Sequence, residues 1–344
     1  MKIVRKINDR LAGRYKRRER KLAPVAHERI QAGLKNGTFD ERLAGYLKYW
    51  LPILGNQKRA GDLTFFVGSK LSRKMLNLKK EQVEPPAQEL YDILRPWFDE
   101  ASGLYDFDGV KLVPAESPAE AEIFGAVFSD ILLPYLLGEE REDVALGISY
   151  EGPYEHGDVR LEPGDVALDC GSNMGMFAAF ASKKGCRVFA LEPSEYIRER
   201  YLDKNAALNG DITVLPYALS DKKETLRFFL DRNNIGSSIR ADEASESAKA
   251  ETKPEDFETV EAVTLDELVA SGKIDRVDFI KADIEGSERL MLRGARQVLK
   301  EFAPKLSICT YHLPDDPKVL RDIILESQPR YRIHQGDCKL YARV

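Results

Sequence analysis

The stretch VALDCGSNMGMFAAFAS, residues 166–182, joins an apolar run to a glycine-containing turn and a helix-like tail. The run at 165–170 predicts a buried strand, and the pattern from 176 onward predicts a helix. Parallel sheets hold their ligands beyond the carboxyl ends of the strands, where the turn DCGSNMG (169–175) should lie. Because glycine carries no Cβ, such a turn lets the backbone approach a ligand closely.

Strand and helix patterns alternate from about residue 150 to the end of the chain. We expect strands within 165–170, 187–193, 212–220, 277–284, 305–312, 330–336 and 338–344, with helical patterns between most of them. An added strand is expected at 225–230, and the acidic stretch 241–258 is expected to be an exposed loop. This alternation predicts an α/β fold with a mostly parallel sheet that helices cover on both faces.

The first part of the chain has a different pattern. Thr38 with Glu41 resembles a capping box, and so does Ser117 with Glu120, where Pro118 suits the first helical position. Pro134 should kink or end the second of these helices. We therefore expect a mostly helical region of unassigned role at 1–145 and a catalytic domain at 146–344.

Bulk composition is that of an ordinary globular protein. The 344 residues are 43% hydrophobic and 32% charged, with a net charge of −5. There is no run of eighteen apolar residues and no apolar segment typical of a signal peptide, so a cytoplasmic location is the default expectation. The four cysteines form no CxxC pair and no other metal-ligand spacing is evident, so we expect neither disulfides nor a metal site.

Residues 1–22 are strongly basic, with ten Lys/Arg and two Asp/Glu. Apolar residues recur there every four positions, which predicts an amphipathic helix. Such a helix could contact an anionic membrane surface weakly, although a solvated helix with one docked stripe is the simpler interpretation. The rest of the chain has a net charge of about −13, which disfavours a nucleic-acid partner. The oligomeric state stays open.

Two ligands compete for the turn at 169–175. A dinucleotide requires G-x-G-x-x-G with its pyrophosphate on the helix N-terminus, whereas this turn has G-x-x-x-G preceded by Asp169. An acid there would repel a pyrophosphate and suit a cationic ligand, which points to S-adenosylmethionine. The second strand ends in Glu192, and a carboxylate at that place can accept hydrogen bonds from ribose hydroxyls.

At these residues the sequence resembles the FkbM-type methyltransferases, a class I family that depends on S-adenosylmethionine. The likeness rests on D-x-G-x-N-x-G at 169–175, on FALEPS and NAALN, on GSSI at 236–239, on FIKADIEGSERLMLRGA at 279–295 and on YHLPDD at 311–316. The resemblance implies a Rossmann-like sheet of seven strands with the last strand antiparallel. It also implies methyl transfer, commonly to a hydroxyl of a carbohydrate or another natural product.

The resemblance also implies positions for the cofactor. The residues expected at its methionine end are Asp169, Gly171, Asn173 and Gly175. Glu192 would bind the ribose, Ala218 would lie near the adenine through its backbone, and Asp283 would face the site from the end of the fourth strand.

An alcohol acceptor needs a general base, and three side chains are candidates. Asp283 and Glu285 would point the same way if the strand continued through both, although Glu285 could instead cap the following helix. His312 ends the next strand, and its ordinary pKa suits proton transfer near neutrality. We take His312 as the base. Ser237 and Ser238 are weaker candidates for binding a polar substrate.

Rival functions remain at this stage. An NAD-dependent oxidoreductase has a related sheet, but the missing G-x-G-x-x-G counts against it. A non-catalytic module that binds the cofactor and a partner through the helical region is a second alternative. The acceptor itself, small molecule or glycan, has no pattern that we can interpret.

Overall fold

The computed structural model describes residues 28–55, 94–116, 118–138, 153–230, 237–238, 257–336 and 338–344. The basic stretch 1–22, Ser117 and most of the acidic stretch 241–258 lie outside these residues. The chain divides into two compact units, one of 1–109 with 114–153 and the other of 110–113 with 154–344. No helix within the described ranges has the length and apolar character needed to cross a bilayer.

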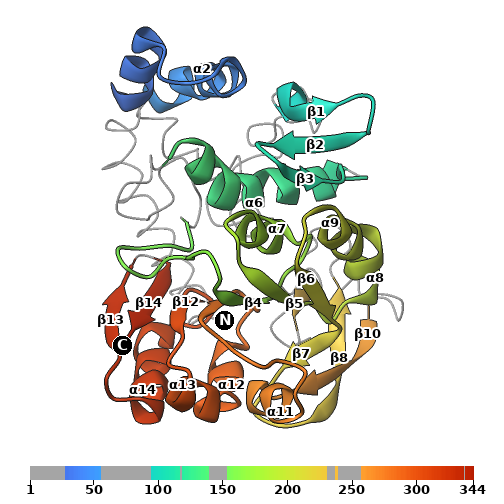
Figure 1. Cartoon of the computed structure of the whole chain (residues 1–344), viewed down its shortest axis with the longest axis vertical. Helices are drawn as coiled ribbons and strands as arrows, with labels where there is room; N and C mark the ends of the chain where they lie inside the picture. The colour runs from blue at the N-terminus through green and yellow to red at the C-terminus, as the bar shows by residue number, and fades with distance from the viewer. Residues whose placement is uncertain are drawn as a thin grey trace, which may run out of the picture. The chain divides into compact units, whose positions relative to one another are not determined.

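The first unit contains the helices that the sequence predicted (Figure 1). Residues 28–36 are helical, α2 spans Glu41–Gly55 and α6 spans Pro118–Leu136. The cap of α2 is Asp40 and not Thr38, because the Asp40 carboxylate accepts a hydrogen bond from Leu43 N at 2.9 Å. Helix α6 continues for two residues past Pro134 before it ends.

Short strands in the first unit were not foreseen. After the turn η3 (Arg95–Trp97), β1 (Phe98–Asp99) pairs antiparallel with β2 (Leu104–Phe107). Asp108 and Gly109 then both have positive φ, 54° and 91°, which is the backbone that an Asp-Gly turn favours. Aromatic side chains gather around this hairpin, where Phe107 and Phe128 have ring centroids 4.9 Å apart.

The second unit is built on a seven-stranded sheet with the order β13-β14-β12-β11-β4-β5-β6. The strands are β4 (Val166–Cys170), β5 (Arg187–Leu191), β6 (Ile212–Leu215), β11 (Phe279–Ala282), β12 (Lys305–Cys309), β13 (Arg332–Gln335) and β14 (Lys339–Arg343). The last strand, β14, runs antiparallel to both of its neighbours, β12 and β13, and the remaining pairs are parallel. The predicted Rossmann-like sheet is thereby confirmed.

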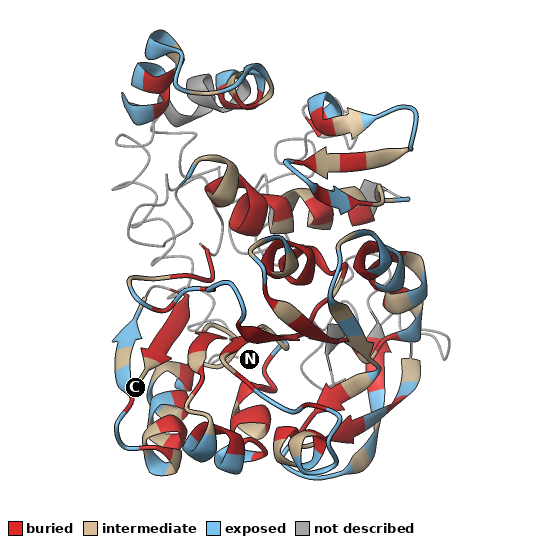
Figure 2. Cartoon of the chain, viewed as in Figure 1, coloured by how far each residue is buried: buried red, intermediate tan, exposed pale blue. Residues whose placement is uncertain are grey.

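Helices cover this sheet on both faces. Figure 1 shows α7 (Met176–Lys183) and α9 (Asp203–Leu208) on one side and α12 (Glu288–Arg293), α13 (Arg296–Glu301) and α14 (Asp316–Ser327) on the other. Between α7 and α9 the chain forms α8 (Glu195–Ile197) and the π-helical turn η4 (Arg198–Leu202). The central strands are buried along their length (Figure 2). Such burial on both faces explains their continuous apolar runs.

A second, four-stranded sheet has the order β7-β10-β8-β9. It contains β7 (Tyr217–Leu219), β8 (Glu224–Leu230), β9 (Ser237–Ser238) and β10 (Phe257–Val263), and α11 (Leu265–Ala270) follows it. The added strand expected at 225–230 is confirmed. The exposed loop expected through 258 is wrong for its last two residues, because Phe257 and Glu258 begin β10 and pair with β8.

Two asparagines, one in α9 and one just after it, accept hydrogen bonds from residues 111–113. Asn205 Oδ1 accepts a hydrogen bond from Val113 N at 2.8 Å, and Asn209 Oδ1 accepts one from Lys111 N at 2.8 Å. Asn205 also donates to Met174 O at 2.7 Å, so the same side chain reaches the turn after β4. The NAALN motif therefore supports the loop in which a ligand is expected.

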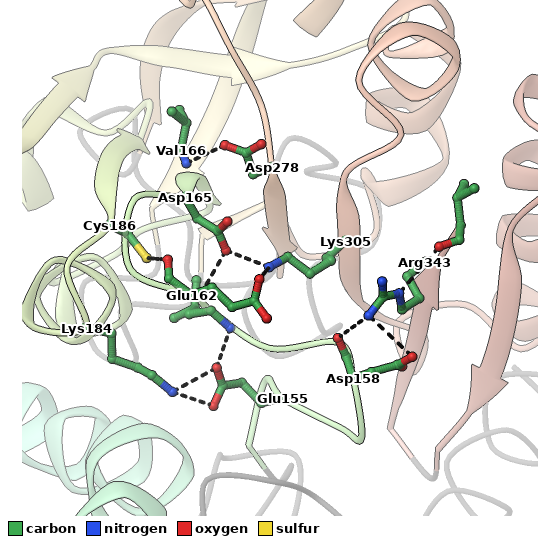
Figure 3. A network of polar contacts seen from close by, with 12 residues as sticks. Glu155, Asp158, Glu162, Asp165, Val166, Lys184, Cys186, Asp278, Lys305 and Arg343 are labelled. Atoms are coloured by element: carbon green, nitrogen blue, oxygen red, sulfur yellow. Dashed lines mark hydrogen bonds and ion pairs between the residues drawn. The ribbon is translucent and has the colours of Figure 1, made fainter.

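A polar network ties together the amino ends of the sheet strands (Figure 3). Asp165, just before β4, accepts from Lys305 Nζ at 2.7 Å, and Asp278, just before β11, accepts from Val166 N at 2.8 Å. The nearly buried Glu155 lies 2.9 Å from Lys184 Nζ. These contacts secure the amino edge, and the candidate site lies at the opposite, carboxyl edge.

Candidate functional site

The loop after β4 uses its own amides to hold its shape. Gly171 N and Ser172 N each donate to Leu191 O at 3.0 Å, Asn173 N donates to Glu192 Oε2 at 3.0 Å, and Gly175 N donates to Ser172 O at 2.8 Å. Met174 N donates to the side chain of Asn173 at 2.7 Å. None of these five amides is left as a donor for a phosphate group, which distinguishes this loop from a dinucleotide cradle.

The two glycines of the loop are required by its geometry. Gly171 has a φ of +77°, and a Cβ there would lie 2.0 Å from the carbonyl oxygen of Asp283. Gly175 has a φ of +82°, and a Cβ there would lie 2.6 Å from Leu202 Cδ1. Gly171 therefore lets the loop after β4 pack directly against the loop after β11, which brings the predicted cofactor turn and the acidic motif together.

Glu192 follows β5 and is only 4% exposed. Its Oε1 accepts a hydrogen bond from Ser194 N at 3.0 Å, and its Oε2 accepts the one from Asn173 N. Burial raises the pKa of Glu192 to about 7, although these backbone hydrogen bonds oppose the rise. Each carboxylate oxygen keeps a second lone pair, so the residue fits the predicted role of accepting two ribose hydroxyls.

Asp169 is fully buried and has a protein partner. It lies opposite Lys281 in the register of β4 and β11, and Lys281 Nζ is 2.9 Å from Asp169 Oδ1. The lysine also donates to Gly171 O at 2.7 Å. Sequence analysis treated Asp169 as a charge open to a cationic ligand, whereas the structure shows its charge balanced by a lysine that also holds the loop.

Asp283 is held by two tyrosines. Tyr154 Oη donates to Oδ2 at 2.8 Å, and Tyr311 Oη donates to Oδ1 at 3.1 Å. Burial acts to raise the pKa of Asp283, but His312, Lys281 and Lys339 outweigh it and hold the pKa below its usual value. Asp283 is therefore an anchored carboxylate at the end of the sheet.

The premise that one strand carries both Asp283 and Glu285 is wrong. Strand β11 ends at Ala282, and Glu285 has a left-handed φ of 52° in the turn that follows. The capping alternative for Glu285 is wrong too, because the N-cap residue of α12 is Ser287 and it makes no side-chain cap hydrogen bond. Glu288 Oε1 instead accepts a hydrogen bond from Ile284 N at 2.9 Å within the turn. The carboxylates of Asp283 and Glu285 nevertheless both face His312, because the turn after β11 lies beside the end of β12.

His312 lies among three carboxylates. Its Nδ1 is 3.0 Å from Glu288 Oε1, and its Nε2 is 3.5 Å from Glu285 Oε2 and 3.6 Å from Asp283 Oδ1. Burial lowers the pKa of His312, but these carboxylates outweigh burial and raise it well above 6.5. Partial burial and the nearby carboxylates of Asp283 and Glu288 raise the pKa of Glu285 to about 6, and His312 opposes the rise. Asp283, Glu285 and His312 thus meet as predicted.

Asp283, Glu288 and His312 each offer a ligand atom within 4.8 Å of the others, a spacing that a metal ion can use. Their atoms already have other contacts, however. Tyrosine hydroxyls occupy both oxygens of Asp283, and Glu288 Oε1 contacts Ile284 N and His312. Glu288 Oε2 and both ring nitrogens of His312 have no hydrogen-bond partner among the described residues, so the expectation of no metal site stays a prediction.

The remaining predicted residues lie in the second sheet. Ala218 is buried in β7 and packs with Phe228, Val260 and Ala262, and its backbone contact with adenine stays a prediction. Ser237 and Ser238 form β9, which pairs with Phe229 and Leu230 of β8. The side chains of these serines lie outside what the structure describes, so their role in substrate binding also stays a prediction.

Sequence reasoning missed four residues that shape the site: Tyr154, Lys281, Glu288 and Tyr311. Lys281 and Glu288 lie inside the segment 279–295, and their charges beside a predicted strand end were a signal that could have identified them. Nothing in sequence marks Tyr154, which reaches Asp283 from 129 residues away.

Comparisons with known proteins found similarity to methyltransferases. Residues 169–333 match the family model described as the methyltransferase FkbM domain. The chain is 29% identical over 167 residues to the hexuronic acid methyltransferase AglP of Haloferax volcanii, a match that covers 48% of this chain. The match spans 64% of the length of that relative.

Solved structures with some likeness to the chain include two methyltransferases. The methyltransferase FkbM of Methylobacillus flagellatus is 24% identical with a TM-score of 0.39, covering 79% of this chain and 65% of that one. A SAM-dependent methyltransferase of Aquifex aeolicus is 16% identical with a TM-score of 0.30, covering 54% of this chain and 86% of that one.

Proposed function

We propose that the chain transfers a methyl group from S-adenosylmethionine to a hydroxyl of a carbohydrate or secondary metabolite, since residues 169–333 match the model of the methyltransferase FkbM domain. One observation carries this proposal most directly. The loop 171–175 packs against the backbone of Asp283, so the predicted cofactor turn adjoins the cluster of Asp283, Glu285 and His312. Donor and acceptor would meet where these two features adjoin.

The cofactor is S-adenosylmethionine, which supplies a methyl group activated on a positively charged sulfur. Glu192 would hold the ribose through the free lone pairs of its two oxygens. Gly171, Asn173 and Gly175 would shape the loop at the methionine end of the cofactor. The ion pair between Asp169 and Lys281 would hold that loop on the sheet. Ala218 would lie near the adenine.

In its neutral form His312 would accept the proton of the acceptor hydroxyl, and because the pKa of His312 is raised well above 6.5, this form becomes more abundant as pH rises above neutrality. A neutral alcohol is a poor nucleophile, and a positioned base typically accelerates such a step by about 10²–10⁴-fold. His312 Nε2 faces Asp283 and Glu285, which would contact the acceptor, and Ser237 and Ser238 would bind its polar groups. Orientation of the two reactants supplies the rest of the acceleration.

The carbohydrate class of acceptor has support from the relative named a hexuronic acid methyltransferase. The name of that relative does not say which atom of the hexuronic acid is methylated. We assign a hydroxyl as the acceptor in this chain because the cluster of Asp283, Glu285 and His312 offers a base and no excess of positive charge to bind a carboxylate. An uncharged hydroxyl also avoids repulsion from the carboxylates of Asp283 and Glu285.

An NAD-dependent oxidoreductase is the weaker candidate. Its pyrophosphate would need free amides in the loop after β4, and the five amides of 171–175 are engaged within the protein. A non-catalytic module that only binds the cofactor would not need a histidine among three carboxylates.

The proposal is tested by incubating the intact chain with methyl-labelled S-adenosylmethionine and a panel of uronic acids, neutral glycans and hydroxylated metabolites. Label in an ether-linked methyl product is the expected result, and His312→Asn should reduce it. Label in a methyl ester of a uronic acid would overturn the hydroxyl assignment while keeping methyl transfer. No transfer to any acceptor, with cofactor bound, would favour the binding module.

A further inference from the structure

The imidazole of His312 has a carboxylate on each side, but the two sides differ. On one side Nδ1 lies 3.0 Å from Glu288 Oε1, and on the other Nε2 lies 3.5 Å from Glu285 Oε2 and 3.6 Å from Asp283 Oδ1. Neither ring nitrogen forms a hydrogen bond of standard geometry with the residues that the structure describes, so these three carboxylates are the acceptors available to the ring. The nearest acceptor for a proton on this ring is therefore Glu288.

Glu288 is fixed in place more firmly than the other two carboxylates. Its side chain is 0% exposed, it is the first residue of α12, and Ile284 N donates to its Oε1 at 2.9 Å. Glu285, by contrast, is 49% exposed in a turn. Asp283 already accepts hydrogen bonds from Tyr154 and Tyr311. Only Glu288 is both buried and directed at the ring by a backbone hydrogen bond.

We propose that Glu288 is a positioning residue, whose carboxylate accepts the proton of His312 Nδ1 and so leaves the lone pair of Nε2 facing Asp283 and Glu285. A neutral imidazole carries one N–H, and the hydrogen bond made by one nitrogen decides which of the two is protonated. A buried carboxylate behind a catalytic imidazole fixes its tautomer in the same way in serine proteases. The link to turnover rests on the proposed function, because only there does Nε2 take the hydroxyl proton.

The charges around the ring support this arrangement. Glu288, Glu285 and Asp283 face the ring, Lys281 and Lys339 act on Asp283 from β11 and β14, and Tyr311 packs beside the ring with centroids 4.1 Å apart. The carboxylates raise the pKa of His312. Loss of either Glu288 or Glu285 should lower that pKa, so a change in pKa alone does not identify the positioning residue. The tautomer of the neutral ring does.

The experiment is a titration of the full chain labelled with ¹⁵N-histidine, followed by NMR of the ring nitrogens from pH 6 to pH 10. The chain has four histidines, and His312→Asn identifies the signals of His312. The expected neutral form of His312 carries its proton on Nδ1. Glu288→Met should move the proton to Nε2, whereas the matched variant Glu285→Met, which removes a carboxylate from the other nitrogen, should leave it on Nδ1.

Turnover gives a second measurement. Glu288→Met should lower kcat on the order of 10²-fold, since a misplaced base loses its contribution, while the Kd of S-adenosylmethionine changes little. A neutral wild-type ring protonated on Nε2, or a ring still charged at pH 10, would overturn the proposal even if Glu288→Met fails to fold. The NMR titration needs no cofactor, so it tests the position of the proton on His312 independently of the proposed function. Failure to bind S-adenosylmethionine would refute the proposed function alone.

Discussion

Lys281 Nζ lies 2.9 Å from Asp169 Oδ1, and the two residues occupy paired positions on the adjacent parallel strands β4 and β11. Both side chains are almost completely removed from water, with exposures of 6% and 0%. The lysine also donates to the carbonyl of Gly171. One ion pair thus connects the centre of the sheet to the loop that we assign to the cofactor.

Asp169→Asn should destabilise the protein, because it leaves a buried lysine without its counter-charge. Removing one partner of a buried pair typically costs about 3–5 kcal/mol. Urea unfolding measures this loss. The double variant Asp169→Asn with Lys281→Met should recover part of it, since no unpaired charge remains. Asp322→Asn, which breaks the exposed pair with Lys318, is the control and should cost far less, because water screens that pair. Equal losses for Asp169→Asn and Asp322→Asn would refute the structural role of the buried pair.

Gly171→Ala should weaken both folding and cofactor binding, because its Cβ would lie 2.0 Å from the carbonyl oxygen of Asp283. Gly164→Ala is the matched control, since Gly164 also has a positive φ, +89°, but open space around it. A left-handed alanine alone costs about 1–2 kcal/mol, so Gly164→Ala should lose that amount and keep cofactor affinity. Thermal unfolding and cofactor titration measure the two effects, and similar behaviour of both variants would contradict the close approach.

Cofactor affinity should rise with pH around neutrality because Glu192 has a pKa of about 7 before the ligand binds. Its ionised form accepts hydrogen bonds from ribose hydroxyls at both oxygens. The ionised fraction grows about tenfold between pH 6 and pH 8, and the association constant should follow it. Calorimetry at several pH values measures this, and Glu192→Gln should bind weakly without the pH dependence. A wild-type affinity that stays constant across this range would exclude Glu192 as the ribose ligand.

Stability should fall as pH rises through the raised pKa of His312. A histidine with a higher pKa in the folded state stabilises the protein fully below its unfolded pKa of about 6.5, and this contribution is lost as pH rises through the folded value. Glu192 and Glu285 lower stability in the same direction, but between their ordinary pKa of 4.5 and about 7. Burial also raises the pKa of Cys170 and Cys186 above the ordinary value of 9.0, so these thiols add to the decline only near and above pH 9. Denaturant unfolding between pH 7 and pH 8 therefore isolates His312, and His312→Asn should flatten the decline. If stability declines just as steeply with pH in that variant, other groups cause the decline.

Chelation should leave turnover unchanged, although Asp283, Glu288 and His312 come within 4.8 Å of one another. The tyrosines on Asp283 compete with an ion for both of its oxygens, and Glu288 Oε1 lies against Ile284 N and His312 Nδ1. Turnover with and without EDTA, after dialysis, measures this. Activity that EDTA abolishes and Mn²⁺ or Mg²⁺ restores would show that the cluster is a metal site instead.

Much of the second unit was predictable from sequence, and the reasons are physical. Buried parallel strands appear as apolar runs such as VALDC, and glycine turns such as GSNMG follow them, so the strands of the main sheet stand out. The hairpin at 98–107 was missed because its strands are only two and four residues long. Strand β10 was missed because its first residues continue the acidic stretch that precedes it.

The site was predictable only in part. Strand ends place Asp169, Glu192, Asp283 and His312 near one edge, and the structure brings Asp283, Glu285 and His312 together. The partners of these residues depend on register and on turn geometry, which spacing does not contain. Lys281 meets Asp169 only because β11 pairs with β4 in this register, and Glu288 meets His312 only because the turn at Glu285 and Gly286 is left-handed.

The most direct measurement is calorimetric titration of the intact chain with S-adenosylmethionine, S-adenosylhomocysteine and NAD in parallel. We predict saturable binding of the first two at one site, weakened by Glu192→Gln, and no binding of NAD. Binding of NAD without the other two would contradict the account at its centre.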